Sequence, residues 1–399
     1  MPSGQPRSIV FRTRTRPCSA AATETGAAGA RNGGAAAGTS LVAALVLGLS
    51  SCSGGDRAQE ARIETEKATE ADEQPIVRTH YCMGTEVTIQ LLLPNQVVGQ
   101  ADHDTLAELA IQEAFFECDR LERLMTTRGT SGSVTRINES AGSATKVTVD
   151  PEVLEVIDRA LEISRVSAGA FDITVGALGS IWRFDLPEWS VPSQSLVESQ
   201  RRLVSWRDVV VSHRDRTVRL RRTGQRITLG GIAKGYAVDK SAQVLTARGF
   251  RDFVIRAGGD LYASGRKGNR QWRVGIRFPR GARDQYFAFV DVEDRTVSTS
   301  GDYERYVVRD GQRYHHLLDP ATGYPAGQCQ SATVIATSAL TADALSTALF
   351  VLGPDRGMDL LRRFPGTEAV FVDSHGKVTV SPGLRLESQP GRAALRIVH

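Results

Sequence analysis

A carboxylate and a hydroxyl lie four residues apart in the segment SALTADALSTALFVLG, as Asp343 and Thr347. Residues at this spacing share one face of a helix, and the other side chains here are largely apolar, which predicts a helix buried almost all round. An unpaired carboxylate there would be costly, and a hard cation such as Mg²⁺ would compensate it by taking carboxylate and hydroxyl oxygens. The alternative is that Asp343 caps the start of the helix, near Thr341.

The segment ITLGGIAKGYAVDK places two glycines before a lysine in the first turn of a predicted helix. Gly230 and Gly231 let the backbone approach a ligand closely. Lys234 adds its charge to the backbone N–H groups and the dipole of the helix N-terminus, which together suit a phosphate. The segment lacks the GxxxxGK[ST] pattern of a P-loop. A tight turn from strand to helix is the alternative interpretation.

Two adjacent histidines, His315 and His316, precede a turn built from Asp-Pro and Gly in YHHLLDPATGYP. Histidine is the side chain best poised to take up a proton near neutral pH. On a strand, residues 314, 316 and 318 face one way and residues 315 and 317 face the other, so only one histidine can face a site. A hairpin whose tip is merely polar is the alternative.

Three more segments are polar and bounded by glycine, and each also has a purely structural interpretation. AGGDLYASG, which contains Asp260, suits a bulge or turn after an apolar strand. SGDYERY suits a surface turn in which Asp302 pairs with Arg305. GAFDITVGAL places Phe171 in a loop after a helix, where an aromatic ring could stack on another ring.

These segments lie in a chain that mixes helical and strand patterns from residue 76 onward. The predicted helices cover 106–125, a stretch starting at Asp150-Pro151, 232–248 and 341–351. The predicted strands cover 85–93, 253–257, 272–278 and 287–292, and hairpins turn at Asp310-Gly311 and Ser374-His375-Gly376. Because strand patterns come in pairs, we predict an α+β fold with antiparallel sheets and packed helices.

Length and composition allow a sizeable buried core, since the chain has 399 residues of which 41% are hydrophobic. Its net charge of +4 comes from the N-terminal arginines of residues 1–51, and the rest of the chain is close to neutral. Nothing therefore suggests a surface that binds nucleic acid.

The first 51 residues are predicted to be a lipoprotein signal segment. An arginine-rich stretch leads into LVAALVLGLSSC, whose apolar run is too short for a bilayer, which needs about 20 residues, but suits a signal peptide. Leu49-Ser50-Ser51-Cys52 resembles a bacterial lipobox, in which the cysteine is lipidated and becomes the new N-terminus. An ordinary signal peptide or an unmodified cysteine is the alternative.

The residues after Cys52 are polar and charged up to residue 75, which predicts a flexible tether. Removal of the leader leaves Cys82, Cys118 and Cys329 unmodified, and without a CxxC pair they imply no metal cluster. Cys118 falls on the apolar face of the first predicted helix, which runs from Leu106 to Met125, so a buried thiol is expected.

Seven segments in order resemble the motifs of the ApbE family, the FAD:protein FMN transferases. They are MGTEVTI, GAFDITVGAL, LGGIAKGYAVD, AGGDLYASG, SGDYERY, HHLLDPATGYP and TADALSTALFVLG. The resemblance runs from about Met83 to Gly353. It implies one catalytic domain, residues 76–390, with an α+β, T-fold-related architecture. It also implies Mg²⁺-dependent transfer of FMN from FAD to a Thr or Ser hydroxyl of a partner protein, with release of AMP.

The resemblance also implies roles for individual residues. Asp343, Thr347 and the backbone carbonyl of Gly231 would hold Mg²⁺, and Lys234 would hold the flavin nucleotide or its phosphate. His316 matches the family's H-[IL]-[IL]-D-P-x-T-G motif and would take the proton of the acceptor hydroxyl. The other residues expected at the FAD site are Met83, Ala170, Phe171, Asp172, Thr228 and Leu318.

Two positions depart from the family pattern. Thr228 stands where the family usually has the aspartate of "DLGG", so that contact with FAD must be lost or made by a hydroxyl. Thr126 and Arg128 stand in a stretch where the family tends to have an aromatic side chain. Arg128 could stack on the flavin ring in its place.

The expected partners follow from the same resemblance. They are FAD, an acceptor protein such as an electron-transport subunit, and a membrane reached through the lipid on Cys52. The protein would then be exported and anchored to a bacterial membrane facing the periplasm. The alternatives are an FAD pyrophosphatase that releases FMN and AMP, an FAD-binding lipoprotein, or a lipoprotein of unrelated function.

Overall fold

A computed structural model describes residues 75–93, 101–129, 131–184, 189–388 and 397–398. These residues belong to one compact unit that spans Ala68–His399. The predicted signal segment, Cys52 and the tether up to residue 74 lie outside the described residues. In the described part of the chain, no helix is long and apolar enough to cross a membrane.

A nine-stranded sheet forms the centre of this unit, in the order β1-β2-β6-β7-β10-β13-β14-β15-β17. Its strands are β1 (Ile76–Cys82), β2 (Thr85–Leu91), β6 (Phe253–Ala257), β7 (Asp260–Ser264), β10 (Arg295–Gly301), β13 (Cys329–Ala336), β14 (Glu368–Asp373), β15 (Val378–Val380) and β17 (Ile397–Val398). Neighbours are antiparallel except β15 and β17. The predicted α+β class with antiparallel pairing is confirmed.

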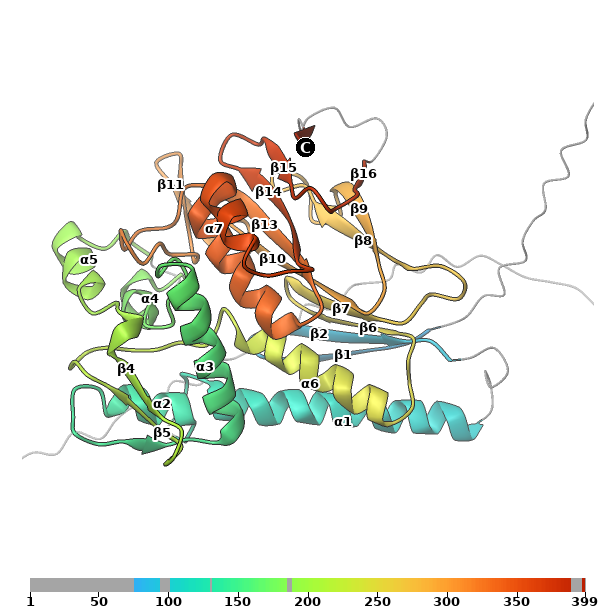
Figure 1. Cartoon of the computed structure of the whole chain (residues 1–399), viewed down its shortest axis with the longest axis horizontal. Coiled ribbons are helices and arrows are strands. Elements are labelled where there is room, and N and C mark those ends of the chain that lie inside the picture. Colours follow the sequence, from blue (N-terminus) through green and yellow to red (C-terminus); the bar gives the residue numbers. More distant parts are fainter. Residues whose placement is uncertain (1–74, 94–100, 130, 185–188, 389–396, 399) are drawn as a thin grey trace, which may run out of the picture. The chain divides into compact units, whose positions relative to one another are not determined.

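Helices cover one face of the large sheet. The helices are α1 (Ala101–Met125), α2 (Ser133–Glu139), α3 (Pro151–Val166), α4 (Gly176–Trp182), α5 (Gln194–Arg201), α6 (Ala233–Ala247), α7 (Ala339–Leu361) and the 3₁₀ turn η1 (Trp206–Asp208). Figure 1 shows α1 and α6 side by side; α6 also packs on α7, and α7 lies along β10 and β13.

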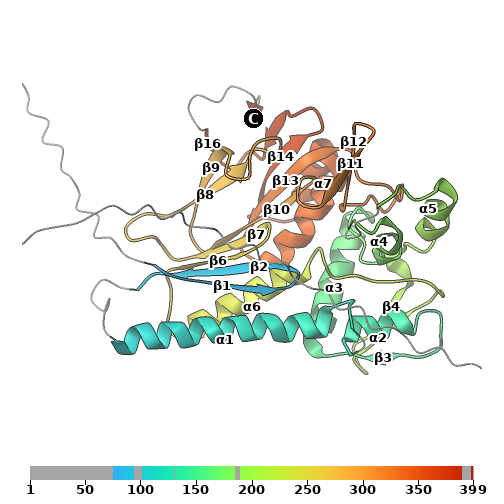
Figure 2. The same cartoon turned by 180° about the vertical axis from the view of Figure 1, so that it is seen from behind.

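Three smaller sheets complete the architecture. They are β16-β9-β8 (Glu387–Ser388, Tyr286–Val292, Trp272–Arg277), β3-β5-β4 (Val147–Thr148, Thr217–Leu220, Val209–Ser212) and the hairpin β11-β12 (Tyr306–Arg309, Gln312–His315). The sheet of β8, β9 and β16 covers the large sheet on the face away from α6 and α7, as the reverse view in Figure 2 helps to follow.

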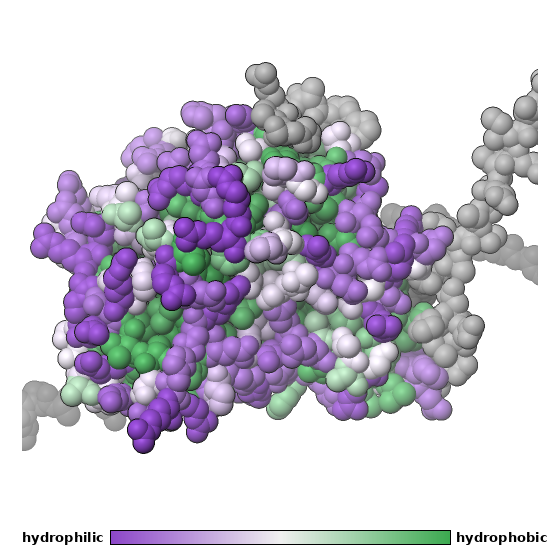
Figure 3. All heavy atoms as spheres, in the orientation of Figure 1, coloured by the Kyte–Doolittle hydropathy of each residue, from purple (hydrophilic) through white to green (hydrophobic). Residues whose placement is uncertain are grey.

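The large sheet has two buried faces, and its central strands show this in their sequence. All eight residues of β13 are buried. Val334 packs into the core shared with the helices, whereas its neighbour Ile335 packs into the core shared with β8 and β9. Alternate side chains of a strand point to opposite faces, so a continuous apolar run is required where both faces are covered. On the face shown in Figure 3, hydrophilic side chains dominate and apolar ones form limited patches.

Most predicted elements are present, and one prediction needs correction. Leu106 was expected on the buried face of α1 but is 53% exposed, and Ala107 is buried in its place; Ala110, Ala114 and Leu121 are buried as expected. The predicted helix 341–351 begins slightly earlier, at Ala339, and its helical backbone is interrupted at Gly353, whose φ of 77° only glycine adopts easily, before a second helical stretch completes α7. Cys118 is buried as expected, beside Ser241.

Candidate functional site

A deep cleft lies where the β1–β2 turn, the loop before α6, the middle of α7 and the segment after β12 converge. It has two adjoining compartments of about 480 and 780 Å³. Residues that line both compartments include Met83, Thr228, Lys234, His316 and Leu318. The sequence segments singled out for their chemistry therefore meet in one cavity, of a size suited to a small-molecule ligand.

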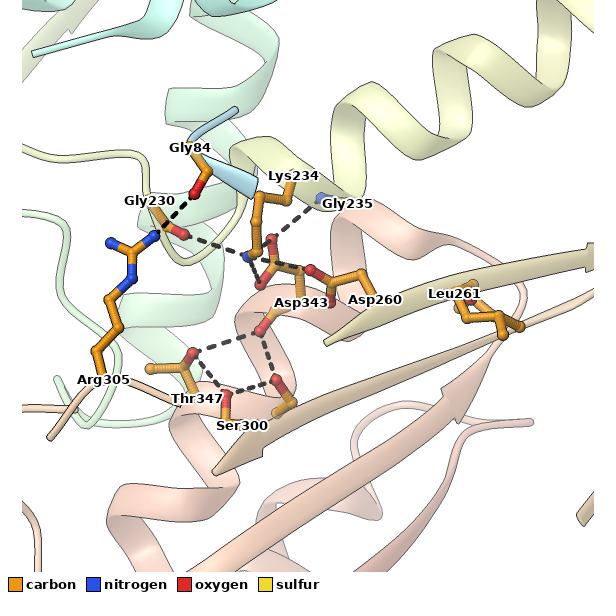
Figure 4. Close-up of polar contacts among 12 residues, drawn as sticks. Gly84, Gly230, Lys234, Gly235, Asp260, Leu261, Ser300, Arg305, Asp343 and Thr347 are labelled. Atoms are coloured by element: carbon orange, nitrogen blue, oxygen red, sulfur yellow. Dashed lines mark hydrogen bonds and ion pairs between the residues drawn. The ribbon is translucent and has the colours of Figure 1, made fainter. Parts of the chain in front are cut away.

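A buried charge cluster forms the floor of the smaller compartment (Figure 4). The ammonium of Lys234 lies 3.0 and 3.1 Å from the two carboxylate oxygens of Asp343, and 3.0 Å from Oδ2 of Asp260. The backbone N–H of Gly235 also donates to Asp343, at 3.1 Å. Asp260 and Asp343 are each only 3% exposed.

The cluster carries more negative than positive charge, because two carboxylates face one ammonium. Burial and the neighbouring Asp260 raise the pKa of Asp343 above its ordinary value, against the opposing effect of Lys234. Burial lowers the pKa of Lys234, but Asp260 and Asp343 outweigh it and raise that pKa. Oδ2 of Asp260 is buried and shares the ammonium of Lys234 with Asp343. A second cation would therefore be stabilised here.

Hydroxyl groups extend the cluster along α7. Thr347 Oγ1 lies 3.2 Å from the hydroxyl of Ser300, which in turn lies 2.8 Å from that of Ser346. Gly231 closes the other side, since a Cβ added there would lie 3.5 Å from Thr347 Oγ1 and 3.3 Å from the ring of Phe171. The predicted metal ligands Asp343, Thr347 and Gly231 thus converge.

These oxygen donors fit Mg²⁺ better than a softer metal. Asp343 offers a carboxylate, Thr347 a hydroxyl and Gly231 a backbone carbonyl, and Mg²⁺ prefers oxygen ligands and keeps several waters. In the described ranges, no group of three His, Cys, Asp or Glu side chains converges to form the nitrogen and sulfur cage typical of zinc.

Interactions at the start of α7 place Asp343 and Thr347 in the cleft. Ser338 is the N-cap, and its hydroxyl accepts from the backbone N–H of Thr341 at 3.3 Å. The carboxylate of Asp239, on α6, accepts the N–H groups of Ala339 and Leu340 at 2.8 and 3.0 Å. The alternative that Asp343 caps this helix is therefore wrong, because Ser338 and Asp239 already do so.

His316 lines the same compartment as Asp343 and Thr347. Its backbone N–H donates to Arg305 O at 3.1 Å, and its ring Nδ1 lies 3.3 Å from the same oxygen. A carbonyl oxygen only accepts, so Nδ1 carries the hydrogen and Nε2 keeps its lone pair. Arg305 is itself held by a 3.1 Å hydrogen bond from its guanidinium to Gly84 O (Figure 4).

The protein keeps His316 neutral. Burial in the cleft, then His315 and Arg305, lower its pKa from 6.5 to about 4. His316 is nevertheless exposed to the cleft and solvent. Its neutral imidazole is within reach of a substrate and can accept a proton, with a basicity below that of an ordinary histidine.

His315 faces away from this site, as the strand argument predicted. His315 is 4% exposed, donates from Nε2 to Ala326 O (3.0 Å), and lines a separate cavity of about 200 Å³. The pairing of His316 with Arg305 continues the β11–β12 ladder, so strand alternation places residues 315 and 316 on opposite faces of the hairpin.

The residues expected to contact flavin all line the smaller compartment, including the Ala170–Asp172 stretch. Phe171 is 5% exposed and packs at Gly231, so it contributes to the floor. The carboxylate of Asp172 accepts from the backbone and hydroxyl of Thr174 (2.8 and 2.6 Å) and from Trp206 N (2.9 Å). Asp172 therefore holds its own loop in shape.

Thr228 and Arg128 also border the cleft, where the sequence departs from the family pattern. The Thr228 hydroxyl accepts the backbone N–H of Gly230 at 3.2 Å and so tightens the glycine turn. Thr126 and Arg128 line the larger compartment. Whether they replace lost flavin contacts stays a prediction, as does phosphate binding by Lys234, whose ammonium is held here by carboxylates.

Three residues that complete the site were not assigned to it from the sequence. Asp260 contacts Lys234, and Ser300 contacts Thr347. Arg305 was expected to pair with Asp302, but Asp302 pairs with Arg280, and the carbonyl of Arg305 accepts from the His316 ring. Asp260 is the first residue of β7, and Ser300 is the last but one of the adjacent strand β10. The pairing of these two strands brings both residues beneath α7. The only available sequence signal was that they belong to the polar segments AGGDLYASG and SGDYERY.

Comparisons with known proteins agree with this geometry. Residues 83–371 match the model of the ApbE family. The chain is 36% identical over 290 residues to the FAD:protein FMN transferase of Treponema pallidum, covering 69% of this chain and 80% of that protein. It is 32% identical over 276 residues to the enzyme of the same name from Escherichia coli K12, covering 67% and 78%.

Solved structures of similar proteins share the fold. The ApbE protein of Thermotoga maritima has 33% sequence identity and a TM-score of 0.66, covering 79% of this chain and 97% of that one. The flavinyl transferase ApbE of Pseudomonas stutzeri has 31% identity and a TM-score of 0.64, covering 79% and 95%. The matched span contains every residue assigned to the site, from Met83 to Thr347, and this chain belongs to the ApbE family.

Proposed function

We propose that this protein transfers FMN from FAD to a hydroxyl group of a partner protein, with Mg²⁺ at Asp343 and His316 as the general base. Its relatives that are at least 30% identical over most of the chain are FAD:protein FMN transferases. The observation that best supports the catalytic assignment is that a neutral His316 and the Lys234–Asp343–Asp260 cluster line one cavity.

The proposed roles concern the bond that forms and the bond that breaks at the FMN phosphorus. The acceptor oxygen forms a bond to the FMN phosphorus, the bond between that phosphorus and the oxygen of AMP breaks, and AMP leaves. Nε2 of His316 takes the acceptor proton, because Nδ1 is already committed to Arg305 O. An alcohol is a weak nucleophile until its proton is removed, so such a base contributes about 10²–10⁴-fold to the rate.

Mg²⁺, held by Asp343, Thr347 and the carbonyl of Gly231, would neutralise charge that develops on the pyrophosphate and on the leaving AMP. Asp260 and Lys234 set the electrostatics of that position, and Ser300 orients the Thr347 hydroxyl. FAD would lie along the compartments lined by Met83, Thr228 and Leu318.

The deciding experiment incubates the purified protein with FAD, MgCl₂ and a candidate electron-transport subunit. Covalently flavinylated subunit, seen as fluorescence in a denaturing gel, supports transfer. AMP and free FMN without labelling would instead support an FAD pyrophosphatase. FAD binding without either product would leave a binding protein.

The same assay tests the base assignment. His316→Ala should lower the labelling rate about 100-fold or more while FAD binding is retained. His375→Ala, at the exposed hairpin after β14, is the matched control and should leave the rate unchanged. Normal turnover by His316→Ala would show that another group is the base, and loss on His315→Ala alone would reverse the assignment of the two histidines.

We also propose that the protein is exported and anchored to a bacterial membrane by lipid on Cys52. The support is the short apolar run that ends at this cysteine and the polar stretch between it and the folded domain. Metabolic labelling with palmitate should mark the wild-type protein and not Cys52→Ala. Equal labelling of both proteins would contradict the anchor.

A further inference from the structure

The hairpin β11–β12 reaches the catalytic segment directly. Its register pairs Tyr306 with His315, and the hydrogen bond from His316 N to Arg305 O continues the ladder by one more pair. The hairpin therefore ends at the residue proposed as the base. Any segment bound along it would be guided toward that residue.

The outer side of β11 presents free main-chain groups. Hydrogen-bonded and non-hydrogen-bonded pairs alternate in an antiparallel ladder. Because Arg305 bonds to His316, Val307 and Arg309 also bond to β12, while Tyr306 and Val308 direct their N–H and C=O groups away from it. The turn is consistent with this alternation of hydrogen-bonded pairs. Asp310 and Gly311 have φ values of 51° and 75°, typical of a two-residue type I′ turn, whose flanking residues form a hydrogen-bonded pair.

No other described strand pairs with this side of β11. Tyr306 and Val308 are 44% and 57% exposed, which is high for large side chains with apolar surface. Proteins usually protect a free edge with a very short strand, charged side chains, proline or a bulge. β11 has four residues, YVVR, without lysine, proline or a bulge, and the guanidinium of its one charged residue, Arg309, is held on Trp189 O.

The hairpin face opposite the side chains of Tyr306 and Val308 packs against the rest of the protein. Arg309 donates to Trp189 O at 3.3 Å. The ring of Tyr314 packs against Trp182 and Trp189, with ring centroids 6.0 and 5.3 Å apart. The edge is therefore a fixed template, so a strand that pairs with it loses little entropy in ordering the enzyme.

We propose that β11 binds an extended segment of the acceptor protein as an added antiparallel strand, which delivers the acceptor hydroxyl to His316. This rests on the proposed transferase function, because that reaction requires a protein segment to enter the cleft. A free edge selects an extended backbone through its N–H and C=O groups. Among partners, the acceptor is favoured because the edge runs into the Arg305–His316 pair.

The first test removes a single main-chain donor from the edge. In Val308→Pro the N–H is lost and the ring obstructs an incoming strand, yet proline is tolerated on an edge strand where the N–H faces solvent. The KM for the acceptor subunit should rise about tenfold, with the affinity for FAD unchanged. Val308→Ala keeps the N–H and is the matched control, for which a much smaller rise is expected.

The second test is amide hydrogen exchange with and without that subunit. The N–H groups of Tyr306 and Val308 should exchange fast in the free enzyme and slow down in the complex, while those of Val307 and Arg309 are protected in both. An unchanged KM in Val308→Pro, or no new protection at Tyr306 and Val308, would overturn the inference. So would protection that depends only on enzyme concentration, which would indicate pairing between two copies of this chain.

The two proposals fail differently in these experiments. If the transferase function is wrong, neither the wild type nor Val308→Pro labels the subunit. If only the strand-addition inference is wrong, both label it with the same KM.

Discussion

The ammonium of Lys234 donates to both carboxylate oxygens of Asp343, and these residues are 109 positions apart in the sequence. Lys234 lies in the first turn of α6, and Asp343 in the second turn of α7. The contact joins the two helices at the floor of the cleft. It also links the charge of the proposed metal position to the stability of the fold.

Asp343→Asn should abolish metal-dependent transfer. The amide has the shape of the carboxylate but lacks its charge, so Mg²⁺ affinity should fall by about 10–100-fold or more. The measurement is FMN transfer as a function of MgCl₂ concentration. Asp359→Asn, an exposed acid later in α7, is the control and should behave like the wild type. Equal magnesium dependence in both variants would contradict the assignment.

Lys234→Met should destabilise the protein and make it depend on Mg²⁺. The change leaves Asp260 and Asp343 buried together without a cation, and loss of one partner in such a cluster costs about 3 kcal/mol. Urea unfolding with and without MgCl₂ measures both effects. The metal should restore more stability in Lys234→Met than in the wild type. The control is Lys377→Met in an exposed turn, where no change with metal is expected.

His316 should titrate at a lower pH than an ordinary histidine. Its pKa is lowered from 6.5 to about 4, so the ring stays neutral as the pH falls through 6.5 and gains its proton only well below that value. The neutral form is the one that accepts a proton, so activity should not be lost near pH 6.5 through this residue. Histidine NMR signals followed over pH 3.5–8, assigned with His316→Ala, test this. A midpoint at or above 6.5 would refute it.

Gly235→Ala should loosen the contact between α6 and α7. A Cβ at this position would lie 2.1 Å from Ala339 O and 2.9 Å from Asp343 Cβ, so the helices must separate. Such overpacking lowers the free energy of unfolding by about 1–3 kcal/mol. The urea midpoint should fall and transfer activity should fall with it. Gly327→Ala is the control, because a Cβ there meets no atom within 4 Å. Equal midpoints would show that the helices adapt.

Sequence patterns were sufficient to predict much of the fold. The turn Asp310-Gly311, the helix starting after Asp150 and the strand Phe253–Ala257 follow from local propensity and hydrophobic period, and the structure has each of them. Local rules predicted less well which side chains are buried, because tertiary packing determines burial. Leu106 is apolar but lies outside the buried face of α1.

The sequence by itself also determined which residue types the site contains, because Asp343 and Thr347 share a helical face and His316 stands in a recognisable segment. Only the tertiary structure decided their partners. Asp260 and Ser300 reach the cluster through the pairing of β7 with β10, and Asp239 fixes the start of α7 from another helix. Such contacts join residues far apart in the chain, so no local period encodes them. The same is true of the two histidines: strand alternation separates their faces, but only the tertiary structure shows that the face of His316 is the one at the cleft.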